Sequence, residues 1–511
     1  MENQSKFMNK TQSQYYKYRL MEILPGALVW LTFIFAISLS FYNPLYGIYF
    51  IIIFDTYFIL KITYMLIWLI MSWIKYRQTI KIDWWDFLRH NHKTWDQYYH
   101  LLLLPTAGEP FEVVDNAFAK LLETNYDHKK MIVVLGGEER LKDHFEPISK
   151  RILEKYKDKF YHIMITVHPM DLPGEVIGKG ANLYHMGHEI KKYFDAHEFD
   201  YKKIIVSAFD VDTVTHHQYF AYLTHKFISH KNPYRASFQP MAFYHNNTWE
   251  SDIFTRVVSN STTFWLLTDL ARPERLLTFS SHSMSWLALV EVGFWQNNIV
   301  TEDSRIFIQC FIHYEGDYEV VPMHIPVSMD TVYVGKFWRS LKNQYKQMRR
   351  WAYGVEHFPY MVWHFNKSKK IPLNKKWIYI WNQTEGIYTW ATAPILVMLM
   401  GYLPLYLAEK RGITSVLAQN TPLILENLMR FGLIGIFFIS VFSVIILPPM
   451  PQKFKNNIVN AVLRYILMFV QWIIFPITMI IFGSIPAVDA QTRLMLGKYL
   501  GFWVTEKKKI N

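Results

Sequence analysis

Two acidic motifs in the polar middle of the chain could bind a metal ion and accept a proton. Asp210 and Asp212 flank Val211, directly after the apolar run 204–209, and Asp303 ends the triplet Thr301-Glu302-Asp303. Carboxylates at the end of a strand can hold Mg²⁺ or Mn²⁺, and such an ion can bridge the oxygens of a diphosphate leaving group. A separate carboxylate can take a proton from an attacking hydroxyl. The motifs therefore predict a divalent metal site at Asp210 and Asp212 and a general base at Asp303.

Each acidic motif also has a simpler interpretation. Asp-x-Asp is common in solvated turns, although a position after a strand favours ligand binding. Thr301 or Asp303 could instead start the helix that contains Arg305. Capping and catalysis are compatible, because a helix start would hold Asp303 rigidly.

A third group, Gln347, Arg350 and Trp351, lies on a predicted amphipathic helix at 338–353. The three-residue spacing puts Gln347 and Arg350 on one face, with Trp351 four residues from Gln347. Arginine can bind phosphate oxygens with its planar fork, and tryptophan can stack on a sugar ring. Taken alone, the group also fits a basic interfacial helix with tryptophan at the headgroup level.

These motifs need a scaffold, and the middle of the chain predicts one. Apolar runs at 100–105, 131–135, 161–167 and 204–209 alternate with amphipathic segments such as 111–123. Alternation of this kind is typical of a parallel sheet with helices on both faces. In such a sheet ligands bind beyond the carboxyl ends of the strands, where Asp210 and Asp212 lie.

Apolar residues concentrate at both ends of the chain, which is 51% hydrophobic. Runs long enough to cross a bilayer occupy 23–41, 46–74, 386–408, 431–447 and 465–484. Asp55 and Lys61 interrupt the second run; they could line a path for a polymer or emerge at the interface. The net charge of +12 comes partly from clusters beside these runs, which fits an anionic cytoplasmic leaflet better than nucleic acid. The single cysteine, Cys310, excludes an internal disulfide.

Basic residues near the span ends predict a plasma-membrane protein whose polar middle faces the cytoplasm. Three later spans would leave Lys507 to Lys509 outside. A re-entrant run, a miscounted span or a tail that departs from the positive-inside tendency could explain this. The expected organisation is a cytosolic tail (1–22), a transmembrane hairpin (23–74), an interfacial linker (75–97), the α/β domain (98–345), interfacial helices (346–385), about three spans (386–484) and an interfacial basic tail (485–511). Segments 82–89 and 494–504 could lie along the membrane surface.

Taken together, the motifs resemble those of the membrane-bound family-2 glycosyltransferases, which include cellulose, chitin and hyaluronan synthases. That family carries Asp-x-Asp, Thr-Glu-Asp and Gln-x-x-Arg-Trp in this order. The stretch 104–110 looks like its first strand and nucleotide-binding turn, and Gly178 to Leu183 looks like its Gly-Lys-x-x-Ala-Asn stretch. The resemblance covers roughly 101–351 and implies a cytosolic Rossmann-like GT-A domain embedded in a transmembrane helical protein.

By this resemblance, Asp303 would be the base, with Glu302 beside it as a catalytic residue. The nucleotide-sugar would contact Thr106, Glu109, Glu138, Lys179 and Asp210, with Asp210 and Asp212 holding the metal. The diphosphate and acceptor would contact Gln347, Arg350, Trp351 and His282. Two positions depart from the family pattern: Glu138 stands where an aspartate is usual, and His282 where a small residue is more frequent.

The expected function is inverting transfer from a nucleotide-sugar, with a UDP-sugar as the expected donor, to a growing polysaccharide that the spans could translocate. One alternative is a single transfer to a lipid or lipid-linked acceptor. A rival of another class is a catalytically degenerate membrane scaffold or transporter. The expected partners are the donor, a glycan or lipid-linked acceptor and the bilayer, without nucleic acid.

Overall fold

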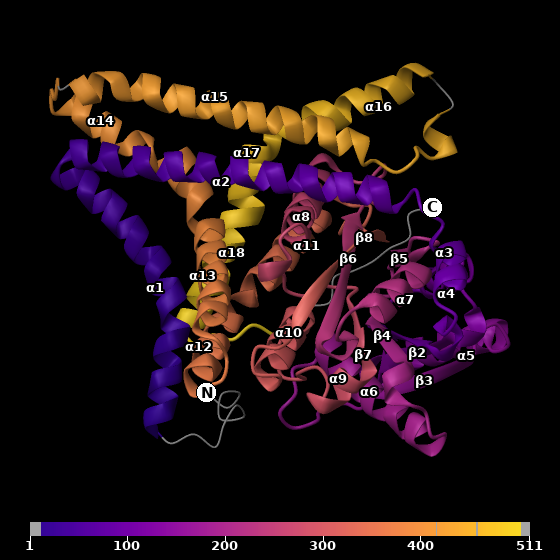
Figure 1. Cartoon of the computed structure of the whole chain (residues 1–511). Helices are drawn as coiled ribbons and strands as arrows, with labels where there is room; N and C mark the ends of the chain where they lie inside the picture. Colours follow the sequence, from indigo (N-terminus) through magenta and orange to yellow (C-terminus); the bar gives the residue numbers. More distant parts are fainter. Residues whose placement is uncertain (1–11, 415, 456–457, 502–511) are drawn as a thin grey trace.

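The computed structural model describes residues 12–414, 416–455 and 458–501, and it shows an α/β domain beside a group of long apolar helices (Figure 1). The chain begins with α1 (Gln12–Tyr42) and α2 (Pro44–Thr79). Asn43 starts α2, because its side chain accepts a hydrogen bond from the Leu45 amide at 3.1 Å and Pro44 suits the first helical turn. The break at Asn43 and Pro44 therefore produces the expected helical hairpin.

Eight strands form one mixed sheet in the order β3-β2-β1-β4-β7-β6-β8-β5. The strands are β1 (Tyr99–Pro105), β2 (Met131–Glu138), β3 (His162–His168), β4 (Ile204–Ala208), β5 (Val214–Thr215), β6 (Ala236–Tyr244), β7 (Ser283–Ser285) and β8 (Glu319–Met329). β3, β2, β1 and β4 are parallel, as the apolar runs predicted. β7 is antiparallel to both β4 and β6, so the prediction of an all-parallel sheet was wrong for this half.

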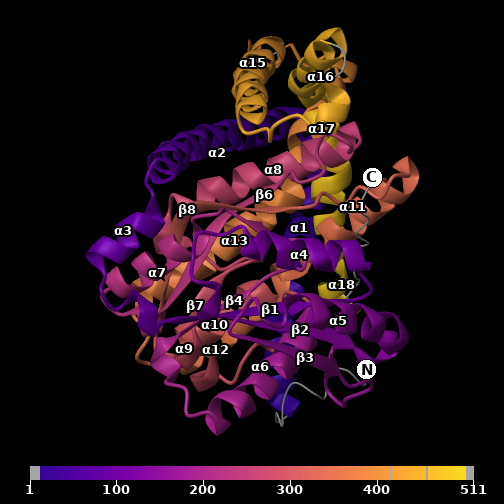
Figure 2. The same ribbon diagram turned by 90° about the vertical axis from the view of Figure 1, so that its right-hand side faces the viewer.

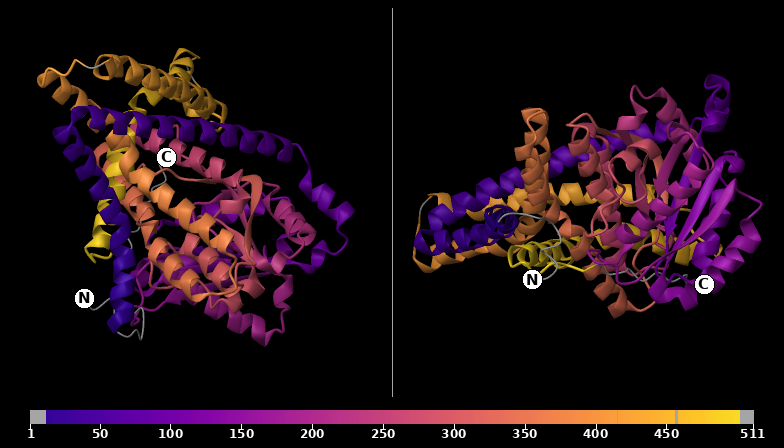
Figure 3. Two further views of the ribbon diagram at one scale, coloured as in Figure 1. Left: turned by 60° about the vertical axis from the view of Figure 1, so that its left-hand side comes forward. Right: turned by 90° about the horizontal axis from the view of Figure 1, so that it is seen from below.

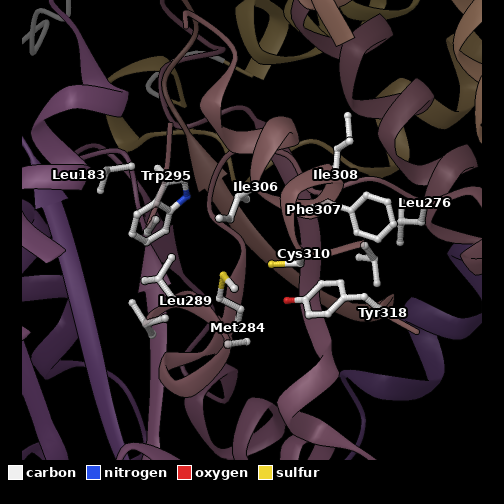
Figure 4. Close-up of a cluster of buried hydrophobic side chains, with 14 of the residues drawn as sticks. Leu183, Leu276, Met284, Leu289, Trp295, Ile306, Phe307, Ile308, Cys310 and Tyr318 are labelled. Carbon is white, nitrogen blue, oxygen red and sulfur yellow. The ribbon is translucent and has the colours of Figure 1, made fainter. Parts of the chain in front are cut away.

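Both faces of the sheet are covered because β1 is apolar on both sides. Leu101 and Leu103 face one core with α6 (Lys179–Ala196), α8 (Ile253–Leu270), α9 (Trp286–Glu291) and α10 (Glu302–His313). Leu102 and Leu104 face the other core with α4 (Phe111–Leu122), α5 (Lys142–Tyr156) and α7 (Tyr219–Ser229). Figure 4 shows part of the first core, where Cys310 packs beside Met284, Ile306 and Tyr318. These cores hold α6 and α10 rigidly against the strand ends.

α3 (Trp84–Asn91), in the segment that could lie along the membrane surface, packs on the α/β domain. The Trp84 ring lies 4.5 Å from that of Tyr222 and 5.1 Å from that of His225, both on α7 (centroid distances). The tryptophan that suggested an interfacial helix therefore belongs to the domain core.

Within the described residues, five helical stretches are long and apolar enough to cross a membrane: Gln12–Tyr42, Pro44–Thr79, Leu373–Lys410, Gln419–Ile445 and Ile458–Met495. The first two stretches are α1 and α2. The last three follow α11 (Phe337–Ala352) and α12 (His357–Lys367) and contain α13 (Leu373–Ile395), α14 (Tyr402–Lys410), α15 (Val416–Ile445), α16 (Ile458–Val470), α17 (Phe475–Thr478) and α18 (Ile485–Met495). Pro394 removes a backbone donor, and the helix widens over Leu396–Met400. Figures 2 and 3 show α15 beside α2 on one side of the α/β domain.

The helix bounds differ from the expected segments at both ends. α1 already begins at Gln12, and the last apolar stretch continues to Met495, where the expected spans stopped at 484. α18 packs on α1, since the Arg19 guanidinium donates to the Leu494 carbonyl (2.8 Å) and the Trp30 indole donates to the Thr492 hydroxyl (2.9 Å). Residues 485–495 therefore pack inside the helical group; residues 1–11 and 502–511, including Lys507 to Lys509, lie outside the described part.

Candidate active site

The carboxylates from distant motifs meet at one ammonium group. The Nζ atom of Lys179 lies 2.9 Å from Asp210 Oδ1 and 2.9 Å from Asp303 Oδ2. Lys179 is the first residue of α6, Asp210 follows β4, and Asp303 lies in the first turn of α10. The structure thus brings together the ends of three elements that are more than 30 residues apart in sequence, as a parallel arrangement of strand ends allows.

Lys179 is charged in this setting. Burial lowers its pKa, but the Coulomb attraction of Asp210, Asp303 and Glu302 outweighs that effect and raises the pKa above its usual range. Its side chain is only 9% exposed. A buried ammonium between two carboxylates contributes to stability only while both partners stay in place.

Glu302 and Asp303 lie in different surroundings. Glu302 is 2% exposed, and burial together with the neighbouring charge of Asp303 raises its pKa to about 8. The Asp303 side chain is 21% exposed and contacts the Lys179 ammonium. Burial therefore favours the protonated form of Glu302, and Asp303 is the more exposed of the two carboxyl groups.

The raised pKa of Glu302 predicts a pH-dependent stability. Because the folded state keeps the proton up to about pH 8, this residue's contribution to stability is complete below its ordinary pKa and is lost as the pH rises toward 8. We expect the Glu302→Gln variant, which imitates the protonated acid, to gain melting temperature relative to wild type, and the gain to grow from pH 5 to pH 8. A constant difference over this range, measured by thermal unfolding in detergent, would contradict a buried neutral Glu302.

Asp210 and Asp212 are oriented by neighbouring loops. The Ser280 hydroxyl donates to Asp210 Oδ2 at 2.8 Å, and the Asp330 amide donates to Asp212 Oδ2 at 3.1 Å. Tyr244 lies near these acids. Burial raises the pKa of Tyr244, and the charges of Asp210, Asp212 and Asp303 raise it further.

These two aspartates suit a metal that arrives with its substrate. Among the described residues, no three His, Cys, Asp or Glu side chains gather closely enough to hold a metal alone. Mg²⁺ is commonly bound by one or two carboxylates together with waters and substrate phosphates, so a larger cage is unnecessary. Asp210 and Asp212 are therefore the candidate residues for the expected divalent cation, and Asp210 also pairs with Lys179 at 2.9 Å.

A second polar network lies at the ends of β2 and β3. Glu138 ends β2, and its carboxylate accepts from Asn182 Nδ2 at 3.2 Å and lies 3.3 Å from His168 Nδ1. The other ring nitrogen of His168 lies 2.8 Å from Glu175 Oε2. Burial lowers the His168 pKa, but the two carboxylates outweigh burial and raise it. Glu138 is thus held in position in the place where the family usually has an aspartate.

Thr106 and Glu109 form the turn after β1. The Thr106 amide donates to the Gly136 carbonyl at 2.7 Å, and Glu109 Oε2 accepts from the Ala107 amide at 2.6 Å. These bonds fix the turn next to Glu138, where the resemblance expected the nucleotide.

Helix α11 contacts α18 on one side and the acidic residues of the site on the other. Arg349 donates to Asp489 of α18 at 2.9 Å. Arg350 lies close enough to Glu302 for its charge to lower the pKa of that acid, against the larger effect of burial. The Trp351 ring lies 5.7 Å from the Tyr244 ring (centroid distance). The face with Arg350 and Trp351 therefore points to the acidic cluster, and Arg349 tethers the helix.

His282 lies behind the site. It is completely buried, its Nδ1 donates to the Phe279 carbonyl at 2.9 Å, and the same nitrogen is 4.0 Å from Asp303 Oδ1. Burial lowers its pKa, so the ring is neutral at pH 7. His282 is absent from the cavity wall, so the structure does not bring it together with the other residues expected to contact the acceptor.

One cavity of about 1460 Å³ joins the remaining candidates. Its wall includes Thr106, Glu109, Glu138, Lys179, Asp210, Asp212, Glu302, Asp303, Gln347, Arg350 and Trp351. The same cavity continues between the apolar helices, where Lys61, Glu385 and Trp390 line it.

Sequence reasoning missed His168, Glu175, Asn182 and Ser280. Asn182 stands in the Gly-Lys-x-x-Ala-Asn stretch, so that motif could have identified it. No spacing pattern connects His168 and Glu175 to the other residues.

No protein-family model and no curated protein matches the chain. Among solved structures, it is similar to the mannosyltransferase PcManGT from Pyrobaculum calidifontis in complex with GDP-Man and Mn²⁺, with 12% identity and a TM-score of 0.45 over 85% of this chain and 100% of the other. It is also similar to S. aureus TarS 1–349 in complex with UDP-GlcNAc, with 13% identity and a TM-score of 0.31 over 65% of this chain and 92% of the other. Both similarities are remote.

Proposed function

We propose that the protein is an inverting membrane glycosyltransferase that uses a nucleotide-diphospho-sugar, with a UDP-sugar as the expected donor, and extends a polysaccharide. The observation that supports this most directly is the convergence of Asp210 and Asp303 on Lys179 inside the large cavity. Three apposed charged groups on the wall of one cavity suit a reaction in which a diphosphate leaves and a hydroxyl loses a proton.

In this mechanism the acceptor hydroxyl attacks the anomeric carbon as the bond to the diphosphate oxygen breaks. Asp303 takes the hydroxyl proton, and the electron pair of the broken bond leaves on the diphosphate. Lys179 and Arg350 offer positive charge near the leaving group, and Asp210 and Asp212 would hold the divalent cation. When bound, that cation supplies further neutralisation of the diphosphate charge. Trp351 and Gln347 offer contacts to the acceptor sugar.

The five apolar helices suggest that the catalytic domain lies at a membrane, and the basic residues near the span ends favour the cytoplasmic face of the plasma membrane. The growing chain could enter the part of the cavity that runs between these helices.

The test is transfer from radiolabelled nucleotide-sugars in membranes that contain the protein. We expect one donor to yield long products and EDTA to stop the reaction, with recovery when Mg²⁺ or Mn²⁺ is added. Products with a single added sugar would instead favour one-step transfer. The absence of transfer and hydrolysis with every donor would favour a scaffold and overturn the proposal.

A further inference from the structure

A second charged group lies on the wall of the cavity, away from the acidic motifs. It combines Lys61 of α2, Glu385 of α13, and Asp269, Arg272 and Arg275 around the end of α8. Lys61 pairs with Glu385 and donates to the Thr389 hydroxyl at 2.6 Å. Arg272 pairs with Asp269, and its Nε donates to the Thr268 carbonyl at 3.3 Å. Two of the three cations are thus neutralised by neighbours.

Arg275 is the third cation, and it gives this group its excess positive charge. Within the described residues its guanidinium makes no side-chain hydrogen bond or ion pair, although the charges of Arg272, Asp269 and Glu385 act on it. It is half-buried on the cavity wall. Asp55, another acid of the cavity, is six residues before Lys61 on α2, a separation of roughly 9 Å along the helix.

The wall near this group has an aliphatic stretch besides the aromatic rings of Tyr57 and Tyr64. α2 and α15 contribute Ile62, Met65, Leu66, Leu433, Ile436 and Ile439. Saturated side chains of this kind favour contact with hydrocarbon, whereas a hydrated glycan requires hydrogen-bonding partners.

We propose that Arg275, supported by Arg272 and Lys61, binds the phosphate of a lipid that carries the acceptor glycan. The planar guanidinium suits phosphate oxygens, and the aliphatic wall suits the lipid chain. The lipid-linked sugar would then lie in the same cavity as Asp303. This inference rests on the proposed transferase function and names its acceptor class.

The probe is a long-chain polyprenyl monophosphate in phosphatidylcholine nanodiscs that hold the full chain. Trp265, Trp381 and Trp390 line the cavity, so quenching of tryptophan fluorescence reports binding. We expect Arg275→Met to weaken binding of this lipid by about tenfold or more, since a charge-assisted hydrogen bond is lost. Arg275→Lys should show a smaller loss because it keeps the charge without the fork. Arg411→Met is the matched control, because Arg411 is exposed on the apolar helices and donates to the Phe41 carbonyl.

Binding of other ligands shows whether the site recognises the polyprenyl phosphate, free phosphate or another lipid headgroup. The polyprenyl alcohol should bind more weakly and equally to wild type and Arg275→Met. Equal binding of polyprenyl phosphate to wild type and Arg275→Met would overturn the inference. So would inorganic phosphate or phosphatidylglycerol binding as tightly as the polyprenyl phosphate, or a soluble oligosaccharide that quenches the tryptophans independently of Arg275.

UDP binding is measured by calorimetry on the same samples. It distinguishes failure of the acceptor inference from failure of the proposed transferase function. Arg275→Met should keep wild-type UDP affinity, which also shows that the variant is folded. If UDP binds and the polyprenyl phosphate does not, the acceptor inference fails while the donor site stands. If no nucleoside diphosphate binds, the proposed function fails as well.

Discussion

The Asp303→Asn variant is expected to transfer sugar about 100- to 10,000-fold more slowly than wild type, the range that removal of a general base produces. Asn keeps the size of the side chain but cannot accept the hydroxyl proton at neutral pH. Nucleotide affinity should stay close to wild type, because Asp210, Glu138 and the turn after β1 are unchanged. The comparison is made with initial rates at saturating donor and with calorimetric UDP binding.

Asp195→Asn is a suitable control for this variant. Asp195 is exposed at the end of α6, where it pairs with Lys191, and it lies outside the cavity wall. Its substitution should leave transfer unchanged. If Asp303→Asn retains wild-type transfer, the base is another residue, and the protonated state assigned to Glu302 must be reconsidered.

Removing the Lys179 charge should affect both folding and transfer. Lys179→Met leaves the carboxylates of Asp210 and Asp303 facing each other without the shared ammonium. Breaking a buried ion pair by removing one partner costs about 3–5 kcal/mol, and we expect the low end, because Asp210 is 30% exposed and water screens it. Transfer should be lost together with donor affinity, since Lys179 stands between the donor-side aspartate and the base.

Lys192→Met is the control on the same helix, because the Lys192 side chain is 72% exposed and pairs with Glu189. Surface substitutions of this kind usually change stability by less than about 0.5 kcal/mol. Chemical denaturation and transfer assays of both variants would decide the matter. Wild-type stability and transfer in Lys179→Met would show that the three-way ion pair does not exist in the folded protein.

Local patterns in the sequence were sufficient for much of the fold. The apolar runs at 100–105, 131–135, 161–167 and 204–209 became β1 to β4, since a fully buried parallel strand leaves a continuous apolar segment. The expected helix at 338–353 became α11, shifted by one residue at each end. The five apolar stretches and the break at Asn43 were also readable, because bilayer-length runs and Pro at a helix start are local signals.

Strand β7 and the burial of His282 could not be predicted from the sequence, because neither has a local sequence pattern. Ser283–Ser285 has three residues with no apolar alternation, and it becomes a strand only because β4 and β6 offer hydrogen bonds on both sides. His282 directly precedes this strand, and it is completely buried with its Nδ1 4.0 Å from Asp303 Oδ1. The sequence placed His282 in a motif by resemblance, and only packing decided that it lies behind the cavity.

The chain by itself determined which residues could perform the chemistry: an Asp pair after a strand, an acidic triplet before a helix and a basic aromatic helix, in that order. The tertiary structure decided which of these residues pair, which are buried and which stay exposed. It placed Lys179 between Asp210 and Asp303, buried Glu302 so that its pKa is raised, and left the Asp303 side chain partly exposed on the cavity wall. Protonation and pairing depend on burial and on charges brought close by long-range contacts, and spacing along the chain carries neither.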